Sequence, residues 1–186
     1  MSNLAMGGNV TVPAGGLTVI VEWTRSPALD EIDAAAFLLG ADGRVSGDAD
    51  MVFYGQRAAG AVRFERAPAL VPGRDATVFH IDTAALSESV RRIAFSGTLH
   101  GARETGMHFG KVDGLRISVR SAQGEVAAFV PPPATNGETA LVLGELYAVG
   151  NVTGTGANAR IKRYPWSTPG THVDGLSSWL YPIVPN

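Results

Sequence analysis

Acidic side chains crowd the stretch between Leu29 and Gly55, at spacings that could hold a metal ion. Between residues 30 and 50, six acids against one base, Arg44, give a net charge of −5, in a chain whose total is −2. Carboxylates this close repel one another unless a cation or a basic side chain neutralises them. The acids are Asp30, Glu31, Asp33, Asp42, Asp48 and Asp50.

Two pairs of these acids have the spacing of neighbours on one strand face. Glu31 and Asp33 are two residues apart, as are Asp48 and Asp50, which places the carboxylates of each pair roughly 7 Å apart on a strand. If the two strands form a hairpin, we expect both pairs at the same end of it. Oxygen ligands of this kind suit Ca²⁺, which takes 6–8 of them. The alternative is that aspartate is simply favoured in turns.

Other kinds of site find little support in the sequence. There is no cysteine, so disulfides, thiolate metal sites and cysteine nucleophiles are excluded. The four histidines, His80, His100, His108 and His172, lack the spacing of a zinc site. No phosphate-binding loop or serine-nucleophile motif occurs, and we interpret "GTGANA" at 154–159 as a loop. Acid–base catalysis by two carboxylates stays an alternative.

Short alternating runs separated by glycine and proline must position these acids. In "LTVIVEW", residues 17–23, the apolar side chains Leu17, Val19, Val21 and Trp23 share one face. Further strands are expected at 34–39, 51–55, 76–82, 92–99, 115–120, 126–130 and 139–149. A weaker last strand is expected in "NARIKRYPW", residues 158–166, where Pro165 stops it.

This pattern predicts an all-β fold, a β-sandwich of two mainly antiparallel sheets with about ten strands. One short helical segment is expected within residues 83–93. The predicted core residues are Trp23, Phe37, Leu39, Phe53, Phe95, Ile117 and Leu143.

Composition indicates a globular protein of one domain, residues 1–186. Hydrophobic residues make up 45% and charged residues 17% of the chain. The small net charge gives no indication of nucleic-acid binding. The N-terminus lacks a signal-peptide pattern and no apolar run has transmembrane length, so we expect a soluble, cytoplasmic protein. We expect a core sandwich over residues 1–165, with an apolar tail, residues 166–186, docked on it.

Five segments resemble the TerD family of tellurium-resistance and general stress proteins. The most specific is the acidic stretch itself, which is similar to the family's DLDASAFLL…D-D-FVFYNQ block, together with the "GELY" of the last segment. Order and spacing are kept from about Leu4 to about Arg163. The segments are "GGNV" at 7–10, "IVEW" at 20–23, "EIDAAAFLLGADGRVSGDADMVFYGQ" at 31–56, "HFGKVDGLRISV" at 108–119 and "ETALVLGELYAVG" at 138–150.

The resemblance implies a β-sandwich that binds Ca²⁺ through acidic loops and has no known catalytic activity. It also implies a role in resistance to tellurite and other stresses, within cytoplasmic and sometimes membrane-associated protein assemblies. The metal ligands it implies are Glu31, Asp33, Asp48, Asp50 and Asp75.

The sequence also departs from the family pattern. Thr24 stands where an acid usually follows the strand tryptophan, and Glu31 replaces an aspartate. The second acidic segment is reduced to Asp75, while Arg66 and Arg74 have entered it. Arginine supplies the same countercharge as a cation. Ca²⁺ binding is therefore expected to be weak or lost, and without a cation we expect Arg66 or Arg74 to pair with one of the acids.

Three hypotheses follow. The first is a non-enzymatic stress-response protein, a weak Ca²⁺ binder that acts with other proteins of a stress-response assembly and associates with a membrane only indirectly. The second is a cation-free interaction module. The third is a sandwich hydrolase that uses Glu31 with Asp33, or Asp48 with Asp50. The oligomeric state does not follow from the sequence.

Overall fold

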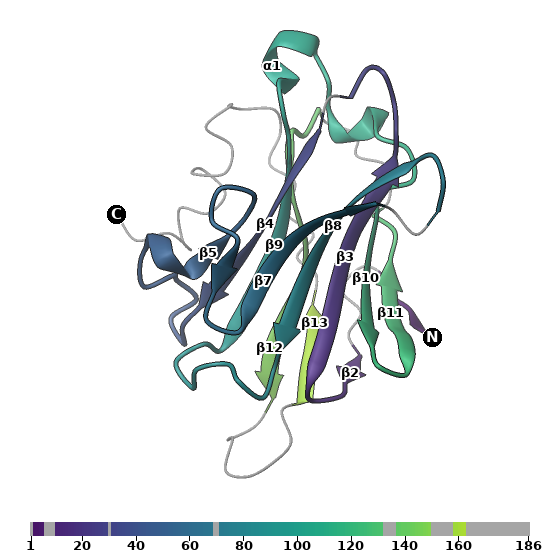
Figure 1. Cartoon of the computed structure of the whole chain (residues 1–186). Coiled ribbons are helices and arrows are strands. Elements are labelled where there is room, and N and C mark those ends of the chain that lie inside the picture. The colour runs from purple at the N-terminus through teal and green to yellow at the C-terminus, as the bar shows by residue number, and fades with distance from the viewer. Residues whose placement is uncertain are drawn as a thin grey trace.

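The computed structural model describes residues 2–5, 10–29, 31–68, 71–131, 137–149 and 158–162. They form two β-sheets packed as two layers (Figure 1). Sheet A has seven strands in the spatial order β1 (Ser2–Asn3), β11 (Gly124–Phe129), β10 (Arg116–Ser121), β3 (Gly16–Thr24), β8 (Arg74–Asp82), β7 (Val62–Pro68) and β6 (Ala58–Ala59).

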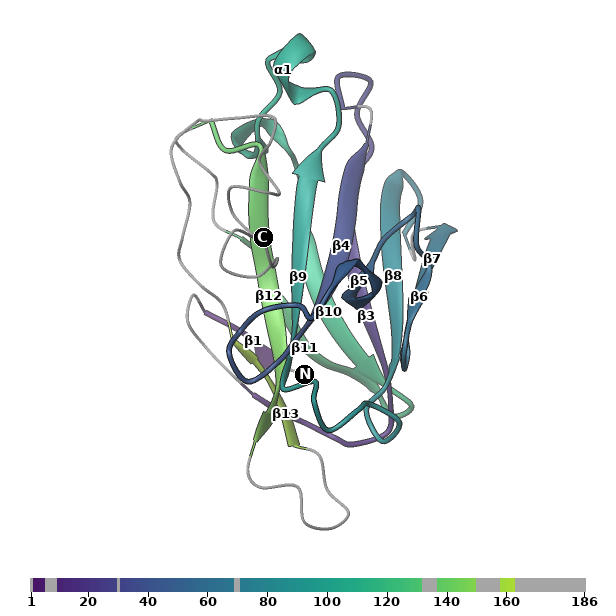
Figure 2. The ribbon, with the colours of Figure 1, turned by 90° about the vertical axis from the view of Figure 1, so that its left-hand side faces the viewer.

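Sheet B forms the second layer, seen from the side in Figure 2. The six strands of sheet B lie in the order β2 (Thr11–Val12), β13 (Asn158–Lys162), β12 (Ala140–Val149), β9 (Arg92–Leu99), β4 (Ile32–Leu39) and β5 (Met51–Val52). In both sheets, all strand pairs in the described part of the chain are antiparallel except β1 with β11. The all-β sandwich predicted from the sequence is confirmed.

The main core lies between the two sheets and follows from the two-residue period of the strands. In sheet A, Val19 lies opposite Val119 on one neighbour and Phe79 on the other, and all three are buried. Phe79 is fully buried and packs between the rings of Phe64 and Phe95, at centroid distances of 5.7 and 5.5 Å. These aromatic contacts join sheet A to sheet B across the core.

A second apolar cluster covers part of the outer face of sheet B. Phe37 and Leu39 alternate with the core-facing residues of β4, so they point away from the main core. They are nevertheless buried, because the connection from β4 to β5 folds back over them. Val45 is buried in this cluster, and Met51 and Phe53 are partly buried against it. Phe53 was predicted as a core residue and is only partly buried, whereas the other six predicted residues are buried.

The helical segment predicted within residues 83–93 is wrong. Residues 83–91 form turns, and Arg92 already begins β9. The side chains of Asp82, Ser87 and Ser89 accept hydrogen bonds or pair locally with this segment, which competes with helical hydrogen bonding. The described helices are instead α1 (Ala102–Thr105) and two 3₁₀ turns, η1 (Asp48–Asp50) and η2 (Phe109–Lys111).

Other sequence-based expectations differ in extent or lie outside the described residues. The strand predicted at 51–55 is shorter, since β5 ends at Val52. Strand β7 was not predicted, because Arg63, Glu65 and Arg66 interrupt its apolar pattern. The tail, residues 166–186, lies outside the described residues, so its docking stays a prediction.

Candidate functional site

The antiparallel register separates the two acid pairs that the sequence analysis expected at one end of a hairpin. Glu31 and Asp33 lie at the start of β4, whereas Asp48 and Asp50 form η1, directly before β5. Met51 pairs with Phe37 and Val52 with Ala36, so η1 lies beside the far end of β4. The expectation of a common end is therefore wrong: in an antiparallel pair, the start of one strand lies beside the end of the other. Asp30 lies outside the described residues.

Glu31 forms an ion pair with Arg66, which comes from the other sheet. Arg66 lies on β7 in the row of Val21 and Thr77, on the side of sheet A that faces sheet B. Its Nη2 donates to Glu31 Oε1. The two side chains are 59% and 33% exposed, so the pair contributes about 0–1 kcal/mol to stability. The prediction that Arg66 or Arg74 would pair with one of the acids is met by Arg66.

Asp33 contacts a histidine that follows the neighbouring strand β9, whereas Asp48 and Asp50 are held within their own loop. The Asp33 carboxylate lies 3.4 Å from His100 Nδ1. Asp50 Oδ2 accepts hydrogen bonds from the backbone N–H and the hydroxyl of Ser46, at 2.7 and 2.5 Å. The backbone carbonyl of Asp48 accepts from the Gln56 amide at 3.0 Å. These contacts tie η1 to its own loop.

Asp75 pairs with Arg25 at the end of the β3–β8 ladder. Arg25 Nη2 and Nε donate to Asp75 Oδ1 at 2.6 and 3.0 Å. The hydrogen bond to Asp75, followed by the charge of that carboxylate, raises the pKa of the Arg25 guanidinium above its usual value. The acid that matched the family's second acidic segment is thus neutralised within the chain.

The described residues do not bring these acids together into a metal-binding group. Ca²⁺ takes 6–8 oxygen ligands at 2.3–2.6 Å, as a rule with several carboxylates among them. Within the described ranges, no three Asp, Glu or His side chains lie close enough together to hold a metal ion. Three of the five predicted ligands, Glu31, Asp33 and Asp75, have an Arg or His side chain as partner instead.

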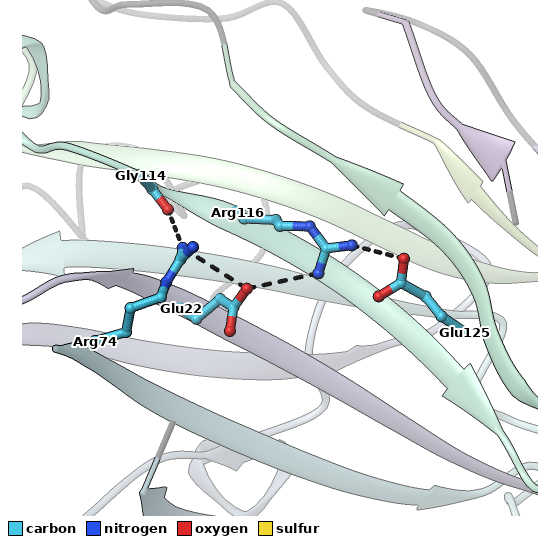
Figure 3. A network of polar contacts seen from close by, with 5 residues as sticks. All are labelled: Glu22, Arg74, Gly114, Arg116 and Glu125. Carbon is cyan, nitrogen blue, oxygen red and sulfur yellow. Dashed lines mark hydrogen bonds and ion pairs between the residues drawn. The ribbon is translucent and has the colours of Figure 1, made fainter. Parts of the chain in front are cut away.

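Sequence reasoning missed a charged network on the outer face of sheet A (Figure 3). Glu22, only 5% exposed, has its carboxylate 3.6 Å from Arg74 Nη2 and 3.6 Å from Arg116 Nη1. Arg116 also contacts Glu125 at 2.6 Å, and Arg74 donates to the carbonyl of Gly114. The network crosses β8, β3, β10 and β11 with alternating charge. Glu22, the only charged residue of β3, was the feature that could have indicated it.

A depression with a volume of about 440 Å³ lies on the same outer face, near the start of β3. Its polar lining includes Thr18, Arg63, His80, Asp82 and Ser121. His80 Nε2 lies 2.8 Å from Glu65 Oε2. None of the five predicted metal ligands lines this depression, so the predicted acids do not meet in it.

Among the described residues, the helices are too short to span a membrane.

Two solved structures have a similar fold. A protein of unknown function, SAV2460, superposes with a TM-score of 0.59 at 18% identity, covering 83% of this chain and 92% of that one. A homologue of telluride resistance protein (TerD), SCO6318 from Streptomyces coelicolor A3(2), superposes with a TM-score of 0.56 at 19% identity, covering 81% and 90%. At these identities the likeness concerns the fold alone.

Sequence comparisons agree on one family. The tellurium resistance proteins TerD of an Alcaligenes species and of Serratia marcescens are 36% and 34% identical to this chain over 122 residues. Each match covers 63% of this chain and 64% of the relative, slightly less than two thirds of the relative's length. A family model described as the TerD domain matches residues 1–157. The chain therefore belongs to the TerD domain family.

Proposed function

We propose that this protein acts in resistance to tellurium compounds such as tellurite, and to stress more generally, as a non-catalytic β-sandwich that contacts other proteins. The observation that carries this proposal is the TerD domain match over residues 1–157, with relatives named tellurium resistance proteins. A chain without cysteine has no thiol to reduce tellurite. Resistance through other proteins therefore accounts for the family relationship better than direct chemistry on tellurite.

The candidate acids favour a binding role over the hydrolase alternative. Glu31 pairs with Arg66 and Asp33 with His100, so each carboxylate has a basic side chain of its own as partner. Asp50 is engaged by two donors of Ser46. A general acid and base must both reach the same substrate, and these contacts give no support to such a pair.

The same contacts favour the cation-free form of the protein. Arg66 and Arg25 supply the positive charge at Glu31 and Asp75 that Ca²⁺ would otherwise supply. We expect any remaining calcium affinity to be weak, with a dissociation constant of about 10⁻⁴–10⁻³ M.

The setting proposed for this function is a cytoplasmic stress-response assembly. The small net charge supports protein partners rather than nucleic acid. Any membrane association would be indirect, through those partners. Whether the protein also contacts copies of itself is measured directly by light scattering of the purified protein.

Tellurite challenge of the host separates this proposal from its alternatives. Deleting the gene should lower survival on tellurite, and re-expression of the wild-type chain at its normal level should restore it. Purified protein, incubated with tellurite and a thiol reductant, should form elemental tellurium no faster than the reductant alone. Unchanged survival of the deletion strain, under tellurite and under oxidative stress, would refute the resistance role. Catalysed tellurite reduction would refute the non-catalytic role.

A further inference from the structure

One part of the outer face of sheet B consists of small and mostly apolar side chains. It is formed by alternate residues of three neighbouring strands, which the register places in two rows: Asp33–Thr98–Ala140 and Ala35–Ser96–Val142. Between the two rows, Ala34 belongs to the main core and Leu141 packs against it, so this set points to the opposite side. We call it the small-residue face: Ala35, Ser96, Thr98, Ala140 and Val142.

The small-residue face is buried although it points away from the core. Ser96 and Ala140 are only 4% and 5% exposed, and Thr98 and Val142 are partly buried. Ala35, at 2%, belongs to the second apolar cluster described above. The hydroxyl oxygens of Ser96 and Thr98 are buried and have no hydrogen-bond partner in the described part of the chain. A buried polar group without a partner costs about 1–3 kcal/mol. Both hydroxyls can therefore take a hydrogen bond from a polar group placed over this face.

The chain itself leads toward this face. Strand β13 pairs with β12 from Val149–Asn158 to Glu145–Lys162. Because the pair is antiparallel, the last residue of β13, Lys162, lies beside Glu145, and β13 points along the edge of sheet B toward Ala140. In the described residues, the first half of β12 has no strand paired on that side. From Glu145 to Ala140 is about 17 Å, a distance that fewer than ten extended residues span.

The residues that follow have the composition of a covering segment. Between residues 171 and 186 the only charged side chain, leaving His172 aside, is Asp174. Six large apolar residues lie in the same stretch, and two of them, Trp179 and Tyr181, also carry a polar group that can reach a buried hydroxyl. The six are Leu176, Trp179, Leu180, Tyr181, Ile183 and Val184.

We propose that the C-terminal segment, residues 171–186, docks on the small-residue face of its own sheet B. Small side chains leave room for the large apolar ones of the segment, and its polar groups pair with Ser96 and Thr98. The segment comes from the same chain because attachment at β13 through a few residues gives an effective concentration of about a millimolar.

Cysteine cross-linking tests the proposal directly, because the chain has no cysteine of its own. The double variant Thr98→Cys with Ser178→Cys places one thiol on the small-residue face and one in the segment. A second double variant combines Thr98→Cys with Ser177→Cys. The matched control joins Ser178→Cys to Thr18→Cys, since Thr18 is a partly buried threonine on the outer face of sheet A. A short bismaleimide at micromolar protein should link the test pair within one chain.

The expected product is a cross-linked monomer, identified by intact mass and peptide mapping. At micromolar protein, an effective concentration near 1 mM favours the link within a chain over one between chains by about a hundredfold or more. Equal linking of the Thr18 control would overturn the proposal, as would no link in either Thr98 double variant. Predominant links between chains would show that a second copy occupies the face, which also overturns it. Circular dichroism of each variant verifies that the sandwich is intact.

Discussion

Replacing Glu22 by glutamine removes the negative charge that lies between Arg74 and Arg116. Each contact of 3.6 Å corresponds to about 5 kcal/mol of gross Coulomb attraction at an effective dielectric constant of 20. Desolvation of the buried carboxylate offsets much of this attraction. Arg116 keeps Glu125 and Arg74 keeps the Gly114 carbonyl after the change. We therefore expect a loss of about 1–3 kcal/mol, below the 3–5 kcal/mol typical of a broken buried pair.

Urea denaturation of the Glu22→Gln variant measures this loss as a lower midpoint at an unchanged slope. For a chain of this length, each kcal/mol lowers the melting temperature by about 2–4 °C. A double-mutant cycle with Arg74→Gln should give a coupling energy of at least about 0.5 kcal/mol. The matched control, Glu65→Gln, removes a carboxylate that is 57% exposed and should change stability by less than about 0.5 kcal/mol. Equal effects of Glu22→Gln and Glu65→Gln, with no coupling to Arg74, would refute the reasoning.

Three further predictions concern the core, the tail and the inter-sheet ion pair. Phe79→Ala should lower the free energy of unfolding, measured by urea denaturation, by about 3–5 kcal/mol. Phe53→Ala should lower it clearly less, because Phe79 is fully buried between two rings and Phe53 is only partly buried. Equal losses would contradict the described core. Deleting residues 171–186 should lower the melting temperature or cause self-association measured by light scattering, whereas an unchanged melting curve with unchanged solubility would argue against docking. Arg66→Gln should lower the free energy of unfolding by at most about 1 kcal/mol at low salt and by nothing measurable at 1 M salt. A salt-independent loss above about 2 kcal/mol would show that the pair with Glu31 is not an exposed contact.

Much of the fold could be predicted because side-chain alternation is a local property. Residues 17–23 and 92–99 follow strands β3 and β9 closely. Strand β7 escaped prediction because charged residues face both sides of it, one of them Arg66, which reaches Glu31 in the other sheet. The helix expected within 83–93 failed because serine and aspartate side chains formed local turns instead.

The candidate site could be predicted only in part, because it depends on register and on contacts distant in sequence. Spacing identified the acids, but not that β5 would pair with the far half of β4 and separate Glu31 from Asp50. Arg66 was named as a partner because it stood where the family has acids, and it does pair with Glu31. The network around Glu22 joins four strands, and no local pattern in the sequence indicates which arginines would meet there.

The melting temperature as a function of free calcium tests most directly whether side chains of the chain itself neutralise its acids. Ligand binding to the folded state stabilises it by RT ln(1 + [L]/Kd). With a dissociation constant of about 10⁻⁴–10⁻³ M, 0.1 mM calcium adds at most about 0.4 kcal/mol, or about 1–2 °C in melting temperature. We therefore predict no larger shift up to that concentration, in the wild type or in the double variant Asp33→Asn with Asp50→Asn. A rise that begins near 10 µM calcium, reaches about 2.7 kcal/mol at a hundred times the dissociation constant and disappears in the double variant would contradict the account.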